Sequence, residues 1–227
     1  CMKTFFKQIL RLLIIFFPWK IRRALLVHFW KYKIHPKAHI GFSYIYPKHL
    51  IMEEGATIGH LNVAIHLDKI MMGQNSIISR GNWITGFPMG NTSRHFSHNN
   101  ERMSELIIGK ESAITKGHHI DCTDRIHIGD FVTIAGYRSQ LLTHSIDIYE
   151  GRQDSHPITI GNYCFVGTGV LIMGGSVLPD YSVLGAGAVL TKKYTEPFKL
   201  YAGVPAIPVK DIIHEAKYFN RDKGFVY

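Results

Sequence analysis

Histidine is the side chain best suited to proton transfer near neutral pH, because its pKa lies close to the working pH. The chain has 14 histidines, and most of them are expected to be ordinary surface or turn residues. His144 stands apart, since it follows two leucines and directly precedes a polar stretch at 145–157. We predict that His144 acts as a general base. Asp147 and Glu150 are candidates to orient its imidazole, although carboxylates in such a stretch are more often solvated.

The three cysteines form no redox or metal motif. The chain has no C-x-x-C pair, and three cysteines make no disulfide framework, which is typical of a reducing compartment. Cys122 and Cys164 stand where small residues are usual in the repeat described next, so we expect them to pack rather than to react. Cys1 precedes Met2 and is given no role.

A six-residue period runs through the second half of the chain. Branched aliphatic residues recur in two series, Ile108, Ile114, Ile120 and Ile126, and then Ile160, Val166, Ile172, Leu178, Leu184 and Leu190. A period of six fits neither a 3.6-residue helix nor a long two-sided strand. It fits a triangular prism in which each unit makes one short strand and one corner. Stacked coils of three units would bury a continuous apolar column.

The period predicts an all-β fold, a parallel β-helix over residues 37–207 with a short tail at 208–227. Looser copies of the pattern at 38–41 and 56–59 place the first coils soon after Pro36. Over 106–193 we expect short strands and almost no helix. The residues expected to face inward are Ile114, Ile120, Ile134, Val166, Ile172 and Leu184. Polar excursions at 87–105 and 145–157 interrupt the coils, and insertions in a rigid solenoid often carry function.

The positive charge is confined to the N-terminal part. The net charge is +9, yet residues 1–52 hold ten Lys and Arg and no acid, whereas the remainder holds sixteen bases and seventeen acids. This distribution argues against a body that binds nucleic acid. Residues 1–36 are expected to form basic amphipathic helices, and the apolar run at 12–17 is too short to span a bilayer. We favour contact with an anionic membrane over packing on the body or on a neighbouring subunit.

The last coils resemble a known family. GAGAVLTK at 185–192, followed by AGVPA at 202–206, is similar to the ending of hexapeptide-repeat acetyltransferases, particularly the galactoside and maltose O-acetyltransferase type and their relatives in surface-polysaccharide biosynthesis. The resemblance covers about residues 106–210. It implies a left-handed β-helix, a homotrimer with active sites between neighbouring prisms, acetyl-coenzyme A as co-substrate and a sugar or glycan acceptor.

The resemblance also assigns roles to positions. His144, in THSID, matches the catalytic histidine, and the backbone N–H of Thr168 matches the group that faces the thioester carbonyl. The positions matched to coenzyme contacts, or available for its phosphates, are Phe165, Gly167, Thr168, Ala186, Thr191, Lys192, Lys193 and Lys210. Phe165 stands where tryptophan is common, and Ile207 stands where a basic residue is often found. The coenzyme's phosphates must therefore rely on Lys192, Lys193 or Lys210.

Direct acyl transfer to a sugar hydroxyl fits these residues. The pKa of the hydroxyl is far above neutral, so a base must take the proton as the new bond forms. Negative charge then develops on the thioester oxygen, where a fixed backbone N–H contributes about 3 kcal/mol. No covalent intermediate is required, because both substrates can meet in one groove.

Several polar residues are candidates for the acceptor pocket. His118 and His119 lie at an expected corner, where they either line this pocket or face solvent. Arg138, Gln140 and Arg152 are candidates to hold acceptor hydroxyls or phosphates.

Three other functions share the predicted fold. γ-Type carbonic anhydrases bind zinc through an H-x4-H pair, and no two histidines here are five apart, so no metal is expected. Transfer to an amino-sugar nucleotide uses the same base and stays open, because only the acceptor pocket separates O- from N-transfer. A non-catalytic scaffold would leave the His144 motif without a use. The basic N-terminus favours modification of a cell-surface polysaccharide or a lipid-linked glycan over that of a free sugar, by a cytoplasmic protein at the inner membrane face.

Overall fold

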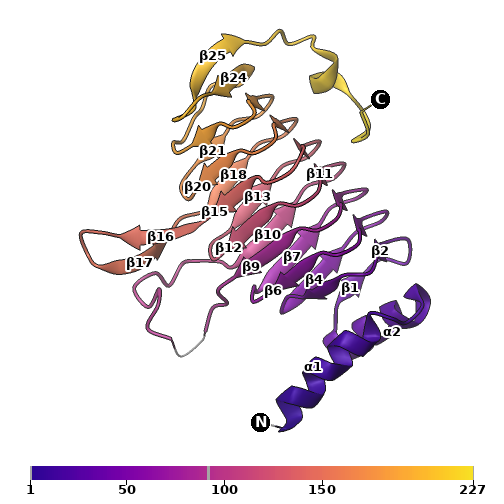
Figure 1. Cartoon of the computed structure of the whole chain (residues 1–227). Helices are drawn as coiled ribbons and strands as arrows, with labels where there is room; N and C mark the ends of the chain where they lie inside the picture. Colours follow the sequence, from indigo (N-terminus) through magenta and orange to yellow (C-terminus); the bar gives the residue numbers. More distant parts are fainter. Residues whose placement is uncertain (1, 91–92, 227) are drawn as a thin grey trace.

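The chain folds as a left-handed parallel β-helix with helices at one end (Figure 1). The computed structural model describes residues 2–90 and 93–226, and it describes side chains from residue 8 onward. The side chains of Lys3 and Lys7 and residues 91–92 of the first excursion lie outside the described residues. The prediction of an all-β prism is confirmed.

Three parallel sheets form the walls of the prism. Wall A contains β1 (Lys33–Ile34), β4 (His49–Met52), β7 (Lys69–Met72), β10 (Glu105–Ile108), β13 (Ile126–Ile128), β18 (Ile158–Ile160) and β21 (Val177–Leu178). Wall B contains β2 (His39–Ile40), β5 (Thr57–Ile58), β8 (Ile77–Ile78), β11 (Ala113–Ile114), β14 (Thr133–Ile134), β19 (Phe165–Val166), β22 (Val183–Leu184), β24 (Lys199–Ala202) and β25 (Ile207–Asp211). Wall C contains β3 (Tyr44–Tyr46), β6 (Val63–Ile65), β9 (Trp83–Gly86), β12 (His119–Cys122), β15 (Gln140–Leu142), β20 (Leu171–Met173) and β23 (Val189–Leu190).

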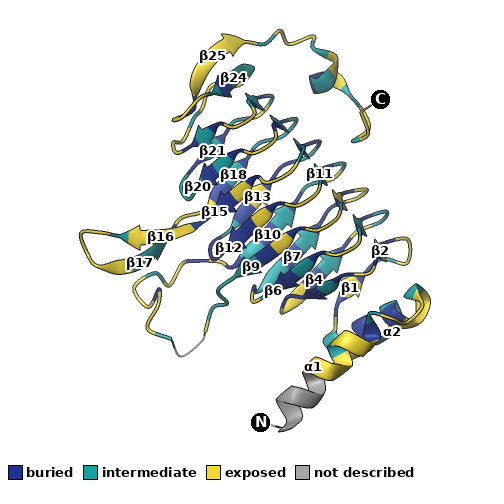
Figure 2. Ribbon diagram, viewed as in Figure 1, coloured by how far each residue is buried: buried dark blue, intermediate teal, exposed yellow. Residues whose placement is uncertain are grey.

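The six-residue register places the aliphatic residues inside the prism, as Figure 2 shows by the buried colour of the strands. Ile134 pairs with Ile114 of the coil before it and with Val166 of the coil after it. All six residues expected to face inward have 0% of their surface exposed. Burial of each such side chain stabilises the fold by about 1.5–3 kcal/mol relative to exposure. Cys122 and Cys164 are also fully buried, and burial raises the pKa of the Cys164 thiol to about 12.

The glycine after the aliphatic position allows neighbouring coils to approach closely. A Cβ at Gly109 would lie 2.5 Å from the carbonyl carbon of Gly129 in the next coil, so no larger residue fits there without moving the backbone. Glycine after the core residue at this position thus allows the tight corner.

The N-terminal helices close the base of the prism. They are α1 (Met2–Ile14) and α2 (Trp19–Trp30). The guanidinium group of Arg22 is buried and donates hydrogen bonds to the carbonyls of Gly41, at 2.6 Å, and Ser43, at 2.7 Å. Leu26 is 1% exposed. The segment expected to be an independent helical appendage is thus partly a cap, and the first strand, β1, already begins at Lys33.

The C-terminal part closes the opposite end and folds back along the prism. Strand β25 pairs antiparallel with β24, so the tail assigned to 208–227 begins within a strand. A 3-10 helix, η1 (Lys217–Asn220), then places Phe219 against the ring of Tyr181, with 5.9 Å between the ring centroids. Further along, the backbone N–H of Gly224 donates to the Glu111 carboxylate at 2.7 Å.

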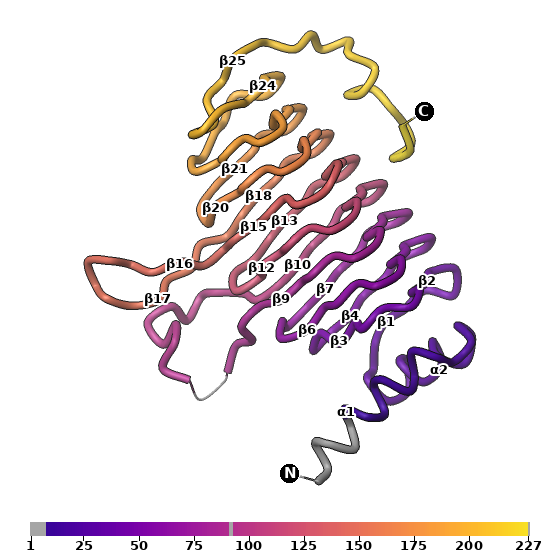
Figure 3. The backbone as a smooth tube through the Cα atoms, viewed as in Figure 1, coloured from indigo at the N-terminus to yellow at the C-terminus, as the bar shows by residue number. Residues whose placement is uncertain are grey.

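The two excursions leave the prism on the same side (Figure 3). The second is a β-hairpin of β16 (His144–Asp147) and β17 (Arg152–Ser155). The first lies against it, because Asn99 donates to the Ser155 carbonyl at 3.2 Å and His98 Nε2 lies 3.4 Å from Asp154 Oδ1.

Candidate active site

His144 begins the hairpin at the corner where the chain passes from wall C to wall A. We call this edge the C–A corner; it follows β3, β6, β9, β12, β15, β20 and β23. Strand β12 lies directly beneath β15, with Asp121 in register with Leu142. This register brings Asp121 next to the backbone and ring of His144.

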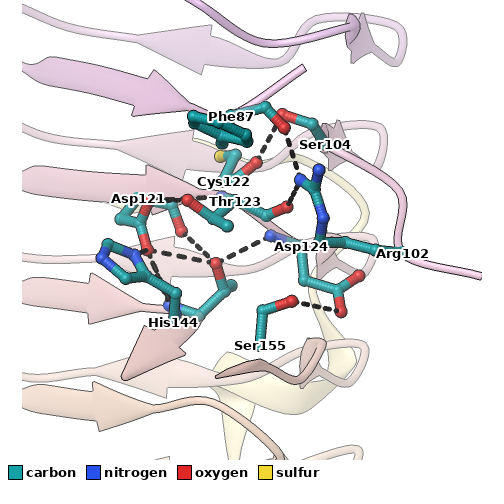
Figure 4. Close-up of polar contacts among 10 residues, drawn as sticks. Phe87, Arg102, Ser104, Asp121, Cys122, Thr123, Asp124, His144 and Ser155 are labelled. Atoms are coloured by element: carbon teal, nitrogen blue, oxygen red, sulfur yellow. Dashed lines mark hydrogen bonds and ion pairs between the residues drawn. The ribbon is translucent and has the colours of Figure 1, made fainter. Parts of the chain in front are cut away.

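Asp121 and His144 form a hydrogen-bonded pair, with 2.6 Å between Asp121 Oδ2 and His144 Nδ1 (Figure 4). The carboxylate is buried, whereas 43% of the histidine side chain is exposed. Since a carboxylate accepts a proton donor at Nδ1, the neutral ring carries its hydrogen there and leaves the Nε2 lone pair free. This is the tautomer that a base acting through Nε2 needs.

The pair shifts both pKa values. The hydrogen bond that His144 donates to Asp121 raises the pKa of His144, an effect that partial burial of the ring only reduces. Burial alone would raise the pKa of Asp121, but the hydrogen bonds from His144 and Thr123 outweigh it and lower that pKa. Asp121 thus stays ionised and stabilises the imidazolium that forms when His144 takes a proton.

Every neighbour of the Asp121 carboxylate is a hydrogen-bond donor. Oδ1 accepts from the Thr123 hydroxyl at 2.7 Å and from the Thr123 N–H at 3.2 Å. Oδ2 accepts from the N–H groups of Thr143 and His144, each at 3.2 Å, in addition to the imidazole. The arrangement therefore requires an ionised acid, and it fixes the direction of the carboxylate.

A buried arginine fastens the first excursion to this pair. Arg102 is 5% exposed, and its guanidinium donates to the carbonyls of Phe87 and Thr123 (Figure 4). Beside it, the Asp124 N–H donates to the Thr143 hydroxyl at 2.9 Å. The loop that carries Thr123 and the turn that carries His144 are thus held by one hydrogen-bond network.

A cavity of about 410 Å³ lies beside His144, between the two excursions. Phe96 lines it, and the Phe96 ring meets the His144 ring edge-on with 6.2 Å between centroids. Arg94 and Arg152 also line it, and neither forms an ion pair within the part of the chain that the structure describes. A cavity with two free guanidinium groups beside a base suits a polar acceptor with oxygen ligands.

Asp121, and not the candidate Asp147, is the carboxylate that contacts the His144 ring. The Asp147 carboxylate accepts the backbone N–H groups of Tyr149, at 3.0 Å, and Glu150, at 3.2 Å, within the hairpin turn. It is therefore a turn residue, and Asp121 is the carboxylate that orients the imidazole. Sequence reasoning missed Asp121 because its contact with His144 depends on which coils are adjacent.

The residues proposed for acceptor binding do not lie together. Arg152 lines the cavity, whereas His119 and Gln140 lie side by side on the outer face of wall C. Arg138 lies just before β15, at the edge of wall C away from His144, with its guanidinium 5.4 Å from the centre of the Tyr137 ring. His118 is buried, donates its backbone N–H to Asn82, and has a pKa lowered to about 4 by burial. It therefore does not line a pocket.

The residues matched to the coenzyme fall on two edges of wall C. Thr168 and Ala186 are exposed neighbours at the edge between walls B and C, which we call the B–C corner. Thr191, Lys192 and Lys193 follow β23 at the C–A corner, above His144. Thr168 and His144 are separated by the width of wall C, roughly 15 Å for five extended residues. One chain alone does not bring His144 and Thr168 to the same thioester.

Three further positions are placed by packing or by strand pairing. Phe165 faces outward from wall B, where the Tyr218 ring packs edge-on against it with 5.8 Å between ring centroids. Gly167 is buried, and a Cβ there would lie 2.6 Å from the backbone nitrogen of Ala186. Lys210 lies in β25 with its side chain exposed. Among the described residues, no group of three or more His, Cys, Asp or Glu side chains is arranged to hold a metal ion.

The fold and this corner define a hexapeptide-repeat β-helix that carries a histidine–carboxylate pair. No protein-family model matches the chain. Over 98 residues it is 36% identical to the galactoside O-acetyltransferase of Escherichia coli K12. The matched segment covers 41% of this chain and 48% of that enzyme. The chain thus spans about half the length of this relative.

Solved structures agree on the fold. The hexapeptide-repeat acetyltransferase of Vibrio cholerae superposes with a TM-score of 0.50 at 23% identity, over 62% of this chain and 73% of that one. A polySia specific acetyltransferase superposes with a TM-score of 0.51 at 21% identity, over 80% and 81%. These likenesses show the fold, and the sequence match confirms the resemblance to hexapeptide-repeat acetyltransferases of the galactoside type.

Proposed function

We propose that this protein is an acetyl-coenzyme A-dependent O-acetyltransferase that acts on a sugar hydroxyl, with His144 as general base. The observation that carries the proposal is the 2.6 Å hydrogen bond between Asp121 and His144, whose ring meets Phe96 in the lining of the cavity between the excursions. The similarity to a galactoside O-acetyltransferase supports acetyl as the group transferred and a sugar hydroxyl, rather than an amine, as its acceptor.

The proposed reaction is a single displacement. His144 Nε2 takes the proton of the acceptor hydroxyl while its oxygen attacks the thioester carbonyl carbon. The negative charge that develops on the thioester oxygen is met by a backbone N–H, for which Thr168 is the candidate. The carbon–sulfur bond then breaks and releases coenzyme A as the thiol. Asp121 stabilises the imidazolium throughout, and no acyl-enzyme forms.

A homotrimer would complete the site. Within one chain the B–C corner, with Thr168 and Ala186, and the C–A corner, with His144, lie on opposite edges of wall C. If the C–A corner of one copy faces the B–C corner of the next, His144 and Thr168 meet across the groove. The separation of the two sets of residues supports this arrangement.

The arginines of the cavity are expected to bind the acceptor. Replacing both, in R94Q/R152Q, should raise the KM for the acceptor roughly tenfold and change kcat little, because each guanidinium is free to bind hydroxyl or phosphate oxygens. Steady-state kinetics with the acceptor varied at saturating acetyl-coenzyme A would measure this. The matched control is K217Q/K223Q, which removes two exposed charges from the tail. An unchanged acceptor KM in R94Q/R152Q would exclude this cavity as the acceptor site.

The coenzyme phosphates are expected to meet Lys192, Lys193 and Lys210. All three side chains are exposed, and none forms an ion pair with a described residue. The triple variant K192Q/K193Q/K210Q should raise the KM for acetyl-coenzyme A by roughly tenfold and weaken its dependence on salt, since exposed charges contribute modestly and are screened. A KM equal to that of wild type would show that they are merely solvated lysines.

Contact with an anionic membrane is proposed for the N-terminal helices. Leu12, Leu13 and Phe16 of this region are 54%, 54% and 71% exposed, and the first 52 residues carry no acid. No helix in the described part of the chain is long and apolar enough to cross a bilayer. Apolar side chains flanked by uncompensated bases fit a helix that lies in the membrane interface. A glycan acceptor assembled at the inner membrane face would then be within reach.

A further inference from the structure

A second cavity lies at the base of the prism, between the N-terminal helices and the first coils. Its volume is about 580 Å³. Arg11 and Trp30 line it from α1 and α2, and Tyr46, Lys48 and His66 line it from the C–A corner. No acidic residue is part of its lining. Lys48 lies 3.8 Å from the Asp68 carboxylate, so Arg11 is the lining arginine or lysine that has no ion pair with a described residue. The cavity thus combines this guanidinium with aromatic walls, and the proposed acetyl transfer does not use it.

Two buried hydrogen-bond donors in this cavity have no partner within the described structure. They are Arg11 Nε and Trp30 Nε1. The Nε atoms of Arg22, Arg102 and Arg221 are unpaired as well among the described residues, so the Trp30 indole N–H is the more informative of the two. Buried N–H groups are almost always paired in folded proteins, and an unpaired indole N–H beside the Arg11 guanidinium points to an acceptor that binds there. The Arg11 guanidinium is also positioned by the Tyr46 ring, whose centre lies 4.9 Å away. The Arg11 guanidinium and the Trp30 indole N–H together suit a phosphate oxygen.

The surface beside the cavity is apolar. Phe29 lines the cavity and is 63% exposed, and on α1 the neighbouring residues Leu12 and Leu13 are both 54% exposed. Of the α1 side chains that the structure describes, only Ile14 is buried. A ligand that fits both surfaces has an anionic head and an apolar chain. A second copy of this chain fits less well, because it would bring more uncompensated bases to the same place.

We propose that this cavity binds the phosphate headgroup of a membrane lipid while the apolar side chains of α1 and α2 enter the bilayer. The inference rests on the membrane contact proposed above and adds a specific headgroup site to it. The cavity and His144 share the C–A corner. His66 follows β6, and His144 follows β15, three strands further along wall C. At about 4.8 Å per strand they are roughly 14 Å apart along the prism, so a glycan attached to the bound lipid phosphate would extend toward His144.

Vesicle binding by the full chain tests the headgroup site. Phosphatidylcholine vesicles would carry either phosphatidic acid or phosphatidylserine at equal surface charge. Wild type is expected to bind the phosphatidic acid vesicles about tenfold more tightly, because their exposed phosphate can accept from both orphan donors. W30F keeps an aromatic ring and the net charge but removes the indole N–H donor. R11M removes the guanidinium donor together with its charge. Each should lose most of the preference, whereas K20M, a charge-matched control, should weaken binding to both vesicles alike.

The outcomes separate the headgroup site from membrane contact itself. If wild type binds phosphatidic acid and phosphatidylserine vesicles equally tightly, the headgroup site is overturned and the membrane contact stands. No binding to any vesicle would overturn both, and the acetyl-transfer proposal would be unaffected. A preference retained by W30F and R11M would place the phosphate elsewhere. Inorganic phosphate is then added at a concentration equal to that of the lipid phosphate. If it displaces the protein from phosphatidic acid vesicles, the cavity is a free-phosphate site and the lipid assignment is overturned.

Discussion

Replacing His144 by alanine is expected to lower kcat by about 10²–10⁴-fold, because a positioned general base contributes a factor of that size. Binding of acetyl-coenzyme A should be nearly unchanged, since the residues matched to the coenzyme are others, from Phe165 onward. The measurement is steady-state turnover on the acceptor, together with the Kd for the coenzyme from calorimetry. Separating kcat from coenzyme affinity distinguishes loss of the base from loss of the site.

The matched control is His156→Ala. His156 lies at the end of the same hairpin, its side chain is 61% exposed, and its nearest acid is Asp154, 3.6 Å away. Its removal should cost little activity. Near-normal turnover by the His144→Ala enzyme on its true acceptor would mean that the base lies elsewhere. His119, which is exposed on wall C, would then be the next residue to test, because His118 is buried and its lowered pKa makes it a poor base near neutral pH.

The prism was predictable because its signal is local. Ile114, Ile134 and Val166 each open a six-residue unit, and the unit length alone requires them to face one axis. The need for a glycine at position 109 is also local, since a side chain there would strike the next coil. Handedness does not follow from the period, and it came only from the resemblance.

The partner of His144 was not predictable in the same way. Asp121 precedes it by one coil, and coils in this chain differ in length because excursions interrupt two of them. Asp147 is nearer in sequence, but the hairpin turn uses its carboxylate. Register within wall C, which pairs Ile120 with Leu141, would have shown that Asp121 lies beneath the His144 turn.

The N-terminal segment shows how one residue type can serve two roles. Ten uncompensated bases predicted a surface segment, yet Arg22 is buried and caps carbonyl groups at the open end of the first coil. A solenoid ends with unpaired backbone groups, and a guanidinium with five N–H donors can satisfy several of them. Charge count alone does not separate such a cap from an exposed base such as Lys20 of α2.

Asp121→Asn is expected to lower kcat/KM by about 10–100-fold and to move its acid limb to lower pH. The reason is that Asp121 raises the pKa of His144 above its ordinary value of 6.5. His144 works as a base only when neutral, so wild-type activity falls as the pH drops through this raised pKa. Without the negative charge the pKa falls, and the neutral ring persists to lower pH. The rate falls nevertheless, because the imidazolium formed in the transition state loses its counter-charge and the ring loses its fixed tautomer.

A pH–rate profile separates this effect from simple destabilisation. The amide N–H₂ of asparagine would face donors on either side, so a lower Tm is expected as well, but a folded, less stable enzyme would keep the wild-type pKa. Asp147→Asn is the matched control, with the same charge change at a carboxylate that accepts only backbone N–H groups of the turn. It should leave the acid limb where it is. A shifted limb in Asp147→Asn with an unshifted limb in Asp121→Asn would return the orienting role to Asp147 and contradict the arrangement at this corner.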